Sequence, residues 1–219
     1  GGNPLAKIIL TASGGPFFGK TAAEMRSVTL EQALQHPNWS MGNKITIDSA
    51  TMMNKGLELI EAMWLYDMPQ EDIEIVIHRE SIIHSAIEFA DGAVLAQLGV
   101  PDMRLPIQYA LTYPARLPCK AERLNLAKAG SFSFYEPDET AFPSIRLARS
   151  AAAGRGNLGA VLSGANEAAV AALLAGDIAF YEIAERVEKA LLDVRFVKEP
   201  TLSDILESDR EARVRAVNG

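Results

Sequence analysis

The sequence is poor in the features that would cross-link a chain or place it in a membrane. Its single cysteine, Cys119, excludes an intrachain disulfide framework and a thiolate zinc cluster, and it fits a reducing compartment. No apolar run approaches the ~20 residues of a membrane-spanning helix, and the first residues lack the basic segment of a signal peptide. The chain has no initiator methionine, so we expect it to begin part-way through a longer protein.

Positive charge is also scarce. Lys and Arg number 21 against 28 Asp and Glu, which gives a net charge of −7. This balance argues against a surface for nucleic acid, because neutralising a phosphate backbone requires clustered cations. A local site for one small phosphate stays compatible with it. The 219 residues, 48% of them hydrophobic, suffice for one large domain or two small ones with a sizeable core.

Local patterns predict an α/β (α+β) region followed by helices. Alternating runs on both sides of Asp91-Gly92 predict a β-hairpin over 85–98, and proline is frequent from 101 to 138. We therefore expect an α/β domain with a mixed sheet flanked by helices at 1–125, a connector at 126–138 and a small all-α helical-bundle domain at 139–219. The predicted strands are 7–11, 44–47 and 73–77. In the first region a short helix is predicted to start at Thr29, and a long one to run from Asp48 or Ser49 to about Tyr66. In the second region four helices are predicted, at 143–153, 165–175, 181–194 and, with a break, 202–217.

A P-loop pattern follows the first predicted strand, from Gly14 to Lys20 and Thr21. In such loops backbone N–H groups surround the phosphates and the lysine contacts the terminal ones. The neighbouring Phe17 and Phe18 are bulky for a backbone that wraps phosphate oxygens. The alternative interpretation is a loop whose phenylalanines pack into the core.

A second candidate lies between Asp48 and Glu58. Ser49 is expected at a helix start, where free N–H groups attract anions, and Asn54 and Lys55 follow about one turn later. This set suits a phosphate monoester, and Glu58 could hold a hard divalent cation beside it. The alternative is a capped helix with a solvated face. Two local costs favour a functional site: Glu58 and Glu61 repel each other, and Gly56 lies inside the helix.

A third candidate is the irregular segment from His36 to Gly42, which includes Trp39 and Met41. A histidine and a tryptophan in one loop could cover a ligand as a lid. The alternative is a surface loop with Trp39 packed on the core.

These motifs together resemble 1-deoxy-D-xylulose 5-phosphate reductoisomerase. The resemblance covers essentially the whole chain in order. It rests on the runs LTASGGPF (10–17), HPNWSMG (36–42), DSATMMNKGLE (48–58), IH (77–78), IHS (83–85), VLAQLG (94–99), PDMR (101–104) and ANEA (165–168), with Ser81.

The resemblance implies an activity. Members of this family rearrange 1-deoxy-D-xylulose 5-phosphate and reduce the product with NADPH to 2-C-methyl-D-erythritol 4-phosphate, in non-mevalonate isoprenoid biosynthesis. A divalent cation (Mg, Mn or Co) binds substrate oxygens and polarises them. The resemblance further implies a bacterial, cytoplasmic homodimer that binds a sugar phosphate and neither nucleic acid nor membrane.

Roles carry over residue by residue from the same resemblance. Ser13, Ser49, Asn54 and Lys55 would hold the phosphate. His36 would contact the substrate under a lid of Trp39 and Met41, and Met41 and Gly42 would lie against the nicotinamide of NADPH. Glu58 would bind the metal, with Glu61 behind it.

Two of the family's features are missing from this sequence. It contains neither a Gly-rich dinucleotide fingerprint nor the Asp-Ser-Glu run that supplies two further metal ligands. We therefore expect the catalytic and C-terminal portions of the enzyme, inactive on their own. Two other functions stay open: a P-loop kinase or NTPase using Gly14, Lys20 and Thr21, and a non-catalytic fragment that binds a phosphorylated sugar.

Overall fold

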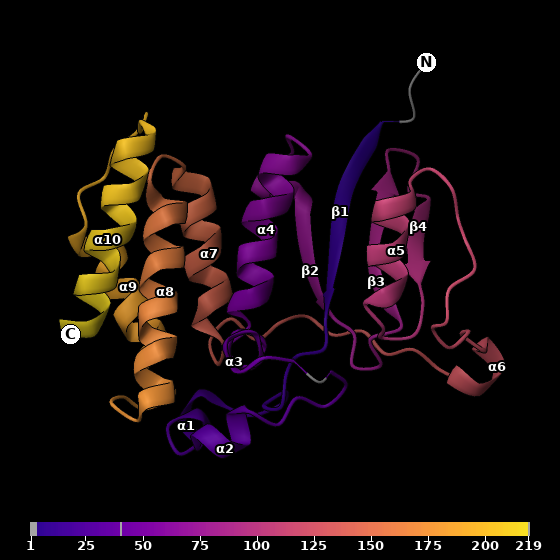
Figure 1. The fold of residues 1–219 in the computed structure, drawn as a ribbon, viewed down its shortest axis with the longest axis horizontal. Coiled ribbons are helices and arrows are strands. Elements are labelled where there is room, and N and C mark those ends of the chain that lie inside the picture. Colours follow the sequence, from indigo (N-terminus) through magenta and orange to yellow (C-terminus); the bar gives the residue numbers. More distant parts are fainter. Residues whose placement is uncertain (1–3, 40, 219) are drawn as a thin grey trace.

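The computed structural model describes residues 4–39 and 41–218. Figure 1 shows a four-stranded sheet with helices stacked beside one of its faces. The N-terminus and the sheet lie at one side of the molecule and the C-terminal helices at the other. The elements in chain order are β1 (Leu5–Ala12), α1 (Ala22–Met25), α2 (Leu30–Ala33), α3 (Asn43–Ala50), α4 (Met53–Leu65), η1 (Gln70–Asp72), β2 (Ile73–Ile77), β3 (Ile83–Phe89), β4 (Val94–Leu98), α5 (Arg104–Thr112), α6 (Leu126–Ala129), α7 (Pro143–Gly154), α8 (Leu158–Ala175), α9 (Glu182–Asp193) and α10 (Leu202–Asn218).

The sheet is mixed and has the strand order β2-β1-β3-β4. β1 pairs in parallel with β2, with Leu10 opposite Ile75, whereas β3 is antiparallel to both β1 and β4. The parallel pair needs a crossover, which α1 to α4 provide. The carboxyl ends of β1 and β2 therefore meet at one edge, where the loops after Ala12 and Ile77 emerge.

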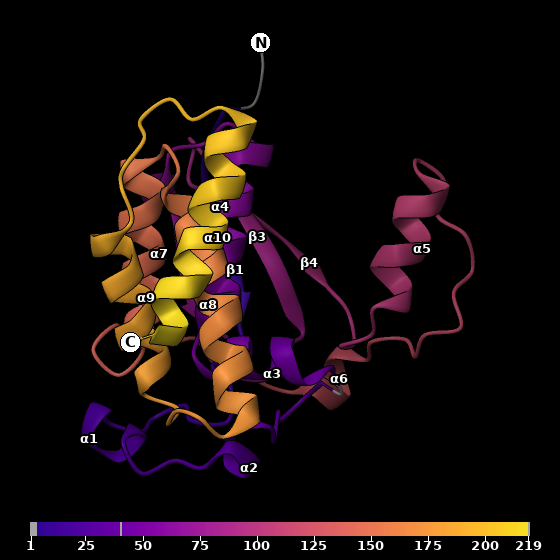
Figure 2. The same ribbon diagram turned by 60° about the vertical axis from the view of Figure 1, so that its left-hand side comes forward.

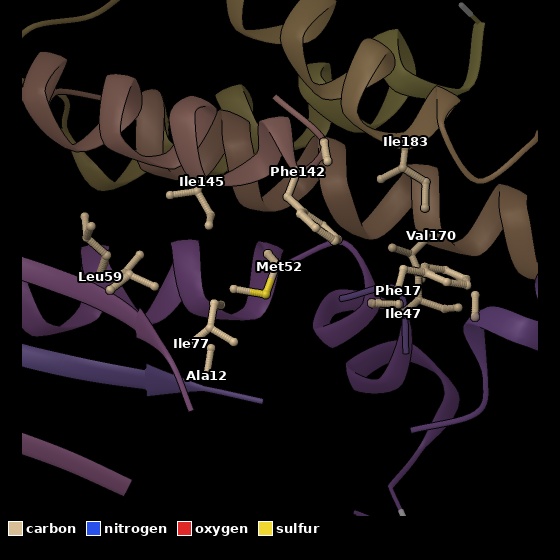
Figure 3. Packing of buried hydrophobic residues seen from close by; sticks show 14 of the residues in the cluster. Ala12, Phe17, Ile47, Met52, Leu59, Ile77, Phe142, Ile145, Val170 and Ile183 are labelled. Carbon is tan, nitrogen blue, oxygen red and sulfur yellow. The ribbon is translucent and has the colours of Figure 1, made fainter. Parts of the chain in front are cut away.

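One apolar core joins the sheet to the C-terminal helices. α4 packs on β1 and β2, and α7 packs on the other side of α4. Figure 3 shows Ala12 and Ile77 of the sheet, Met52 before α4, and Ile145 of α7 in this shared core. The mixed sheet with flanking helices and a helical C-terminal region confirms the predicted fold class.

The predicted strand at 44–47 is wrong, because this segment forms α3. The alternation of exposed Ile45 and buried Ile47 resembles a strand, but Thr46 and Asp48 are also buried, as on one side of a helix. The Thr46 hydroxyl donates to the carbonyl of Gly42, four residues earlier. Packing of α3 against α4 and α8 outweighs the β propensity of these residues.

The predicted helix from Asp48 to Tyr66 is in fact two helices. The chain turns at Met52, which is buried and has a left-handed backbone (φ 64°). Trp64 of α4 is exposed, and the buried side of this helix carries Gly56 and Leu59. Gly56 has a packing reason: a Cβ there would lie 2.6 Å from the Ala148 Cβ on α7.

Two predictions for the second half of the chain also need correction. α8 begins at Leu158 rather than at Ala165, and α10 is continuous. The proline-rich segment 101–138, for which no helix was predicted, contains α5 and α6. Figure 2 shows α5 standing away from the body of the protein, and none of its residues is buried.

Among the described residues, α8 alone is long and apolar enough to cross a membrane by composition. Its mean hydropathy is 1.5, and 56% of it is buried inside the protein. It packs against α7, α9 and α10, which is the environment of a core helix.

Candidate functional site: a cleft at the carboxyl edge of the sheet

The first part of the site is the turn that follows β1. Gly14 and Gly15 both have left-handed backbones, with φ of 76° and 65°. A Cβ at Gly15 would lie 2.8 Å from the carbonyl oxygen of Ser49, so only glycine lets this turn approach the end of α3. The Gly15 N–H donates to Ser13 Oγ at 3.2 Å, which fixes the Ser13 side chain.

His36 completes the hydrogen bonding of Ser13. Its Nδ1 accepts the backbone N–H groups of Asn38 (3.1 Å) and Trp39 (3.0 Å), so the proton of the neutral ring is on Nε2. Nε2 lies 3.1 Å from Ser13 Oγ and donates to it. Ser13 Oγ thus accepts two hydrogen bonds and keeps its own O–H free to donate into the cleft.

The surroundings keep His36 neutral. Burial lowers the pKa of His36, and the nearby guanidinium of Arg79 lowers it further. Both effects disfavour the charged imidazolium. At neutral pH the ring is therefore a donor at Nε2 and an acceptor at Nδ1.

The second part of the site comes from α3 and α4. Ser49 lies in the last turn of α3, so the prediction that it sits at a helix start is wrong. The helix start belongs to α4, whose first turn carries Asn54 and Lys55. The dipole argument for an anion therefore applies to these two residues.

Asn54, Lys55 and Glu58 form one hydrogen-bonded cluster on α4. Asn54 Nδ2 donates to Glu58 Oε1 at 2.7 Å, and Lys55 Nζ pairs with Glu58 Oε2. The Lys55 side chain is only 12% exposed, whereas that of Glu58 is 36% exposed. The ammonium is thus largely removed from water, which strengthens its attraction for an anion. Glu61 is exposed and lies outside this cluster.

Both parts line one cleft of about 470 Å³. The structure thus brings the predicted phosphate, substrate, metal and lid residues together, while Gly42 and Glu61 are not among the lining residues. The predicted residues in the wall are Ser13, His36, Trp39, Met41, Ser49, Asn54, Lys55 and Glu58.

Sequence reasoning missed the wall that comes from the other side of the cleft. His84 lines the cleft with Gln97 and Met103. His84 Nδ1 lies 2.9 Å from Gln97 Oε1, and its buried Nε2 has no partner among the described residues. The available signal was the resemblance itself, because all three residues belong to its motifs.

The segment predicted to form a lid is attached to the turn after β2 through Asn38. Asn38 Nδ2 donates to the carbonyl of Arg79 at 2.8 Å and lies 2.9 Å from Ser81 Oγ. Trp39, which follows Asn38 directly, lines the cleft together with Met41. Ser40 lies outside the described residues.

The described part of the chain does not by itself provide a complete cation site. Residues 4–39 and 41–218 contain no group of three or more His, Cys, Asp or Glu that could hold a metal. Of the two carboxylates in the cleft wall, Asp102 is bound by the Arg104 guanidinium at 2.5–3.0 Å, and Glu58 is bound by Asn54 and Lys55. Hard cations require several oxygens in a fixed geometry, which a single carboxylate does not supply.

The segment from Gly14 to Thr21 does not have the geometry of a P-loop. Phe17 is buried and packs edge-on against Phe180, with ring centroids 5.1 Å apart. The helix that follows, α1, has four residues, and its N-cap Thr21 exchanges hydrogen bonds with Glu24. The N–H groups a phosphate would use are therefore partly occupied.

Two family profiles match the chain. One, described as the DXP reductoisomerase C-terminal domain, covers residues 98–215, and the other, the 1-deoxy-D-xylulose 5-phosphate reductoisomerase C-terminal domain, covers residues 2–66. The chain belongs to the 1-deoxy-D-xylulose 5-phosphate reductoisomerase family.

Individual reductoisomerases agree with this assignment. The enzyme of Exiguobacterium sibiricum is 58% identical over 208 residues, which are 94% of this chain and 54% of the relative. That of Bacillus subtilis is 56% identical over 210 residues, 95% of this chain and 55% of the relative. The chain thus spans about half the length of the curated relatives it matches.

Solved reductoisomerase structures share the fold. The Zymomonas mobilis enzyme in complex with NADPH superimposes with a TM-score of 0.90 at 46% identity, covering 98% of this chain and 55% of that one. A second structure, in complex with NADPH, fosmidomycin and magnesium, gives 0.91 at 44% identity, with 98% and 55% coverage. The P-loop alternative is therefore set aside.

Proposed function

We propose that this chain provides the phosphate-binding wall and the lid of a 1-deoxy-D-xylulose 5-phosphate reductoisomerase. The observation that carries the proposal is the convergence of Ser13, Ser49, Asn54 and Lys55 on one cleft. Together they offer two hydroxyls, an amide and an ammonium, which is a donor set suited to a phosphate monoester.

Three of the four donors, Ser13, Asn54 and Lys55, have capacity left for the phosphate. Ser13 keeps its O–H, because its oxygen already accepts from Gly15 and His36. Lys55 has three N–H donors and Asn54 Nδ2 has two, and Glu58 uses one of each. The anion can therefore bind without breaking the Glu58 cluster.

The remaining cleft residues would enclose the sugar. Trp39 and Met41 would exclude water from the bound sugar, and His36, next to Ser13, would contact it. Glu58 would offer a single carboxylate to a divalent cation. Solved relatives hold NADPH and magnesium, and we propose the same cofactors for the whole protein, with Met41 and Gly42 near the nicotinamide. Because the described residues lack a complete cation site, we expect the 219-residue chain to bind substrate without turning it over.

Titration of the purified chain with 1-deoxy-D-xylulose 5-phosphate tests the proposal, with unphosphorylated 1-deoxy-D-xylulose as the control ligand. Lys55→Ala should weaken binding about 10- to 100-fold, the equivalent of one lost charge-assisted hydrogen bond. Lys20→Ala removes a lysine outside the cleft wall and should leave binding unchanged. Equal affinity for the two sugars, or a Lys20→Ala effect as large as that of Lys55→Ala, would overturn the phosphate assignment. Turnover with NADPH at an enzyme-like rate would overturn the expected inactivity.

The bacterial relatives support a cytoplasmic enzyme, and we further propose that it is a homodimer. β4 is an edge strand with exposed Val94 and Leu95, and α5, which stands away from the body of the protein (Figure 2), exposes Ile107 and Leu111. A second copy would cover this apolar surface. The mass of the chain in solution tests this proposal.

A further inference from the structure

The structure gives Arg79 a position between the two halves of the site without placing it in the cleft wall. Arg79 follows β2, and its half-buried guanidinium reaches across to the turn after β1. Its Nη1 donates to the carbonyls of Ser13 (2.5 Å) and Gly15 (2.7 Å). The guanidinium also lies over the Phe18 ring, 5.0 Å from its centre.

We propose that Arg79 is a positioning residue of the anion site, because it holds the Ser13 turn in the conformation that directs the Ser13 hydroxyl into the cleft. This inference rests on the proposed function. Arg79 acts through Ser13 and does not touch the ligand itself.

The turn needs an external clamp. Gly14 and Gly15 are left-handed and lack a Cβ, so their own backbones restrict the turn very little. The two carbonyls that bracket Gly14 point to one side and meet the two N–H groups of a single Nη1. The lysine side chain is one atom shorter, and its ammonium lacks the planar face that lies over the Phe18 ring, so lysine is not an equivalent replacement.

The same residue also connects the lid to the turn. The Arg79 carbonyl accepts from Asn38 Nδ2 in the lid segment, and the Arg79 charge lies near His36. The neighbouring carboxylate of Glu80 binds the N–H and O–H of Ser133. Loss of the guanidinium should therefore disturb Ser13 and His36 together.

The experiment measures the binding of inorganic phosphate to the whole chain by histidine NMR. The sequence has only three histidines, so a His36→Gln variant assigns the His36 signal. Arg79→Lys and Arg79→Gln are compared with Arg149→Lys. Arg149 is a matched control, because its guanidinium also donates to backbone carbonyls, those of Gln70 (3.3 Å) and Ile73 (3.4 Å), away from the cleft.

We expect Arg79→Lys to weaken phosphate binding about tenfold and Arg149→Lys to leave it unchanged, while both lower the melting temperature. The pKa of His36 should rise in Arg79→Gln and stay low in Arg79→Lys, which separates charge from hydrogen-bond geometry. If Arg79→Lys binds phosphate within twofold of the wild type, or if Arg149→Lys loses as much phosphate affinity as Arg79→Lys, the inference about Arg79 is wrong while the proposed function stands. Absence of phosphate binding by the wild type, or wild-type affinity in Lys55→Ala, would instead overturn the proposed function on which it rests.

Discussion

Replacing Gly56 by alanine should destabilise the protein, although alanine is the better helix former. Gly56 lies inside α4, where the exchange by itself would gain about 1 kcal/mol. The new Cβ, however, would lie 2.6 Å from the Ala148 Cβ and 3.4 Å from the Ser144 carbonyl oxygen. Carbon atoms pack at roughly 3.5–4.0 Å, so α4 and α7 must move apart by about 1 Å.

Overpacking of a well-packed core costs about 1–3 kcal/mol, and the rigid contact here favours the upper part of that range. Subtracting the gain in helix propensity leaves a net loss of about 1–2 kcal/mol. At this chain length each kcal/mol lowers the melting temperature by roughly 2–4 °C. Urea denaturation and calorimetry measure both quantities.

Gly159→Ala in α8 is the matched control. A Cβ at Gly159 would meet Ile60 at 3.9 Å, which is ordinary contact. This variant should therefore be neutral or slightly stabilising. If Gly56→Ala melts at or above the wild-type temperature, the close approach of α4 and α7 does not explain the glycine, and a functional reason would have to be sought.

Two further predictions concern a buried pair of polar side chains and the half-buried His36. Asn166→Ala removes the Nδ2 donor that lies 2.8 Å from the carboxylate of Asp48, a residue that is 2% exposed. We expect the free energy of unfolding, measured by urea denaturation, to fall by about 2 kcal/mol. The loss should be smaller in an Asp48→Asn background, where the acceptor is uncharged. Equal losses in both backgrounds would argue against coupling between these side chains. His36 has a pKa below its unfolded value of about 6.5, so unfolding binds a proton and stability should fall as the pH falls below about 6.5. His36→Gln should flatten this part of the curve of unfolding free energy against pH, and an unchanged slope would contradict the assignment.

The sheet was predictable because its signals are local. Asp91-Gly92 defines the hairpin and short β-branched runs define β1 and β2, as observed. The strand predicted at 44–47 failed because part of the surface that buries α3 comes from α8, which lies far away in the chain. The break at Met52 was likewise invisible, because a left-handed methionine has no sequence signature of the kind glycine provides.

Eight residues of the cleft wall were predicted, but their arrangement was not. The resemblance named Ser13, His36 and Lys55, whereas the assignment of Ser49 to a helix start came from spacing and was wrong. Arg79 was missed because its partners are backbone carbonyls. Every residue has a backbone carbonyl, so the sequence does not indicate which ones an arginine will bind. Roles for the wall residues in binding substrate, metal or cofactor stay predictions.

The shared core between the sheet and the C-terminal helices restricts where the gene can be divided or recombined. Ile8 and Ile75 from the strands belong to one apolar cluster with Ile145, Val170 and Ile183 from the helices. A gene cut near residue 138 would leave both products with half of that cluster facing water. Recombination between homologues at this point would succeed only where the two parents carry matching contacts, so the two regions should evolve as one unit.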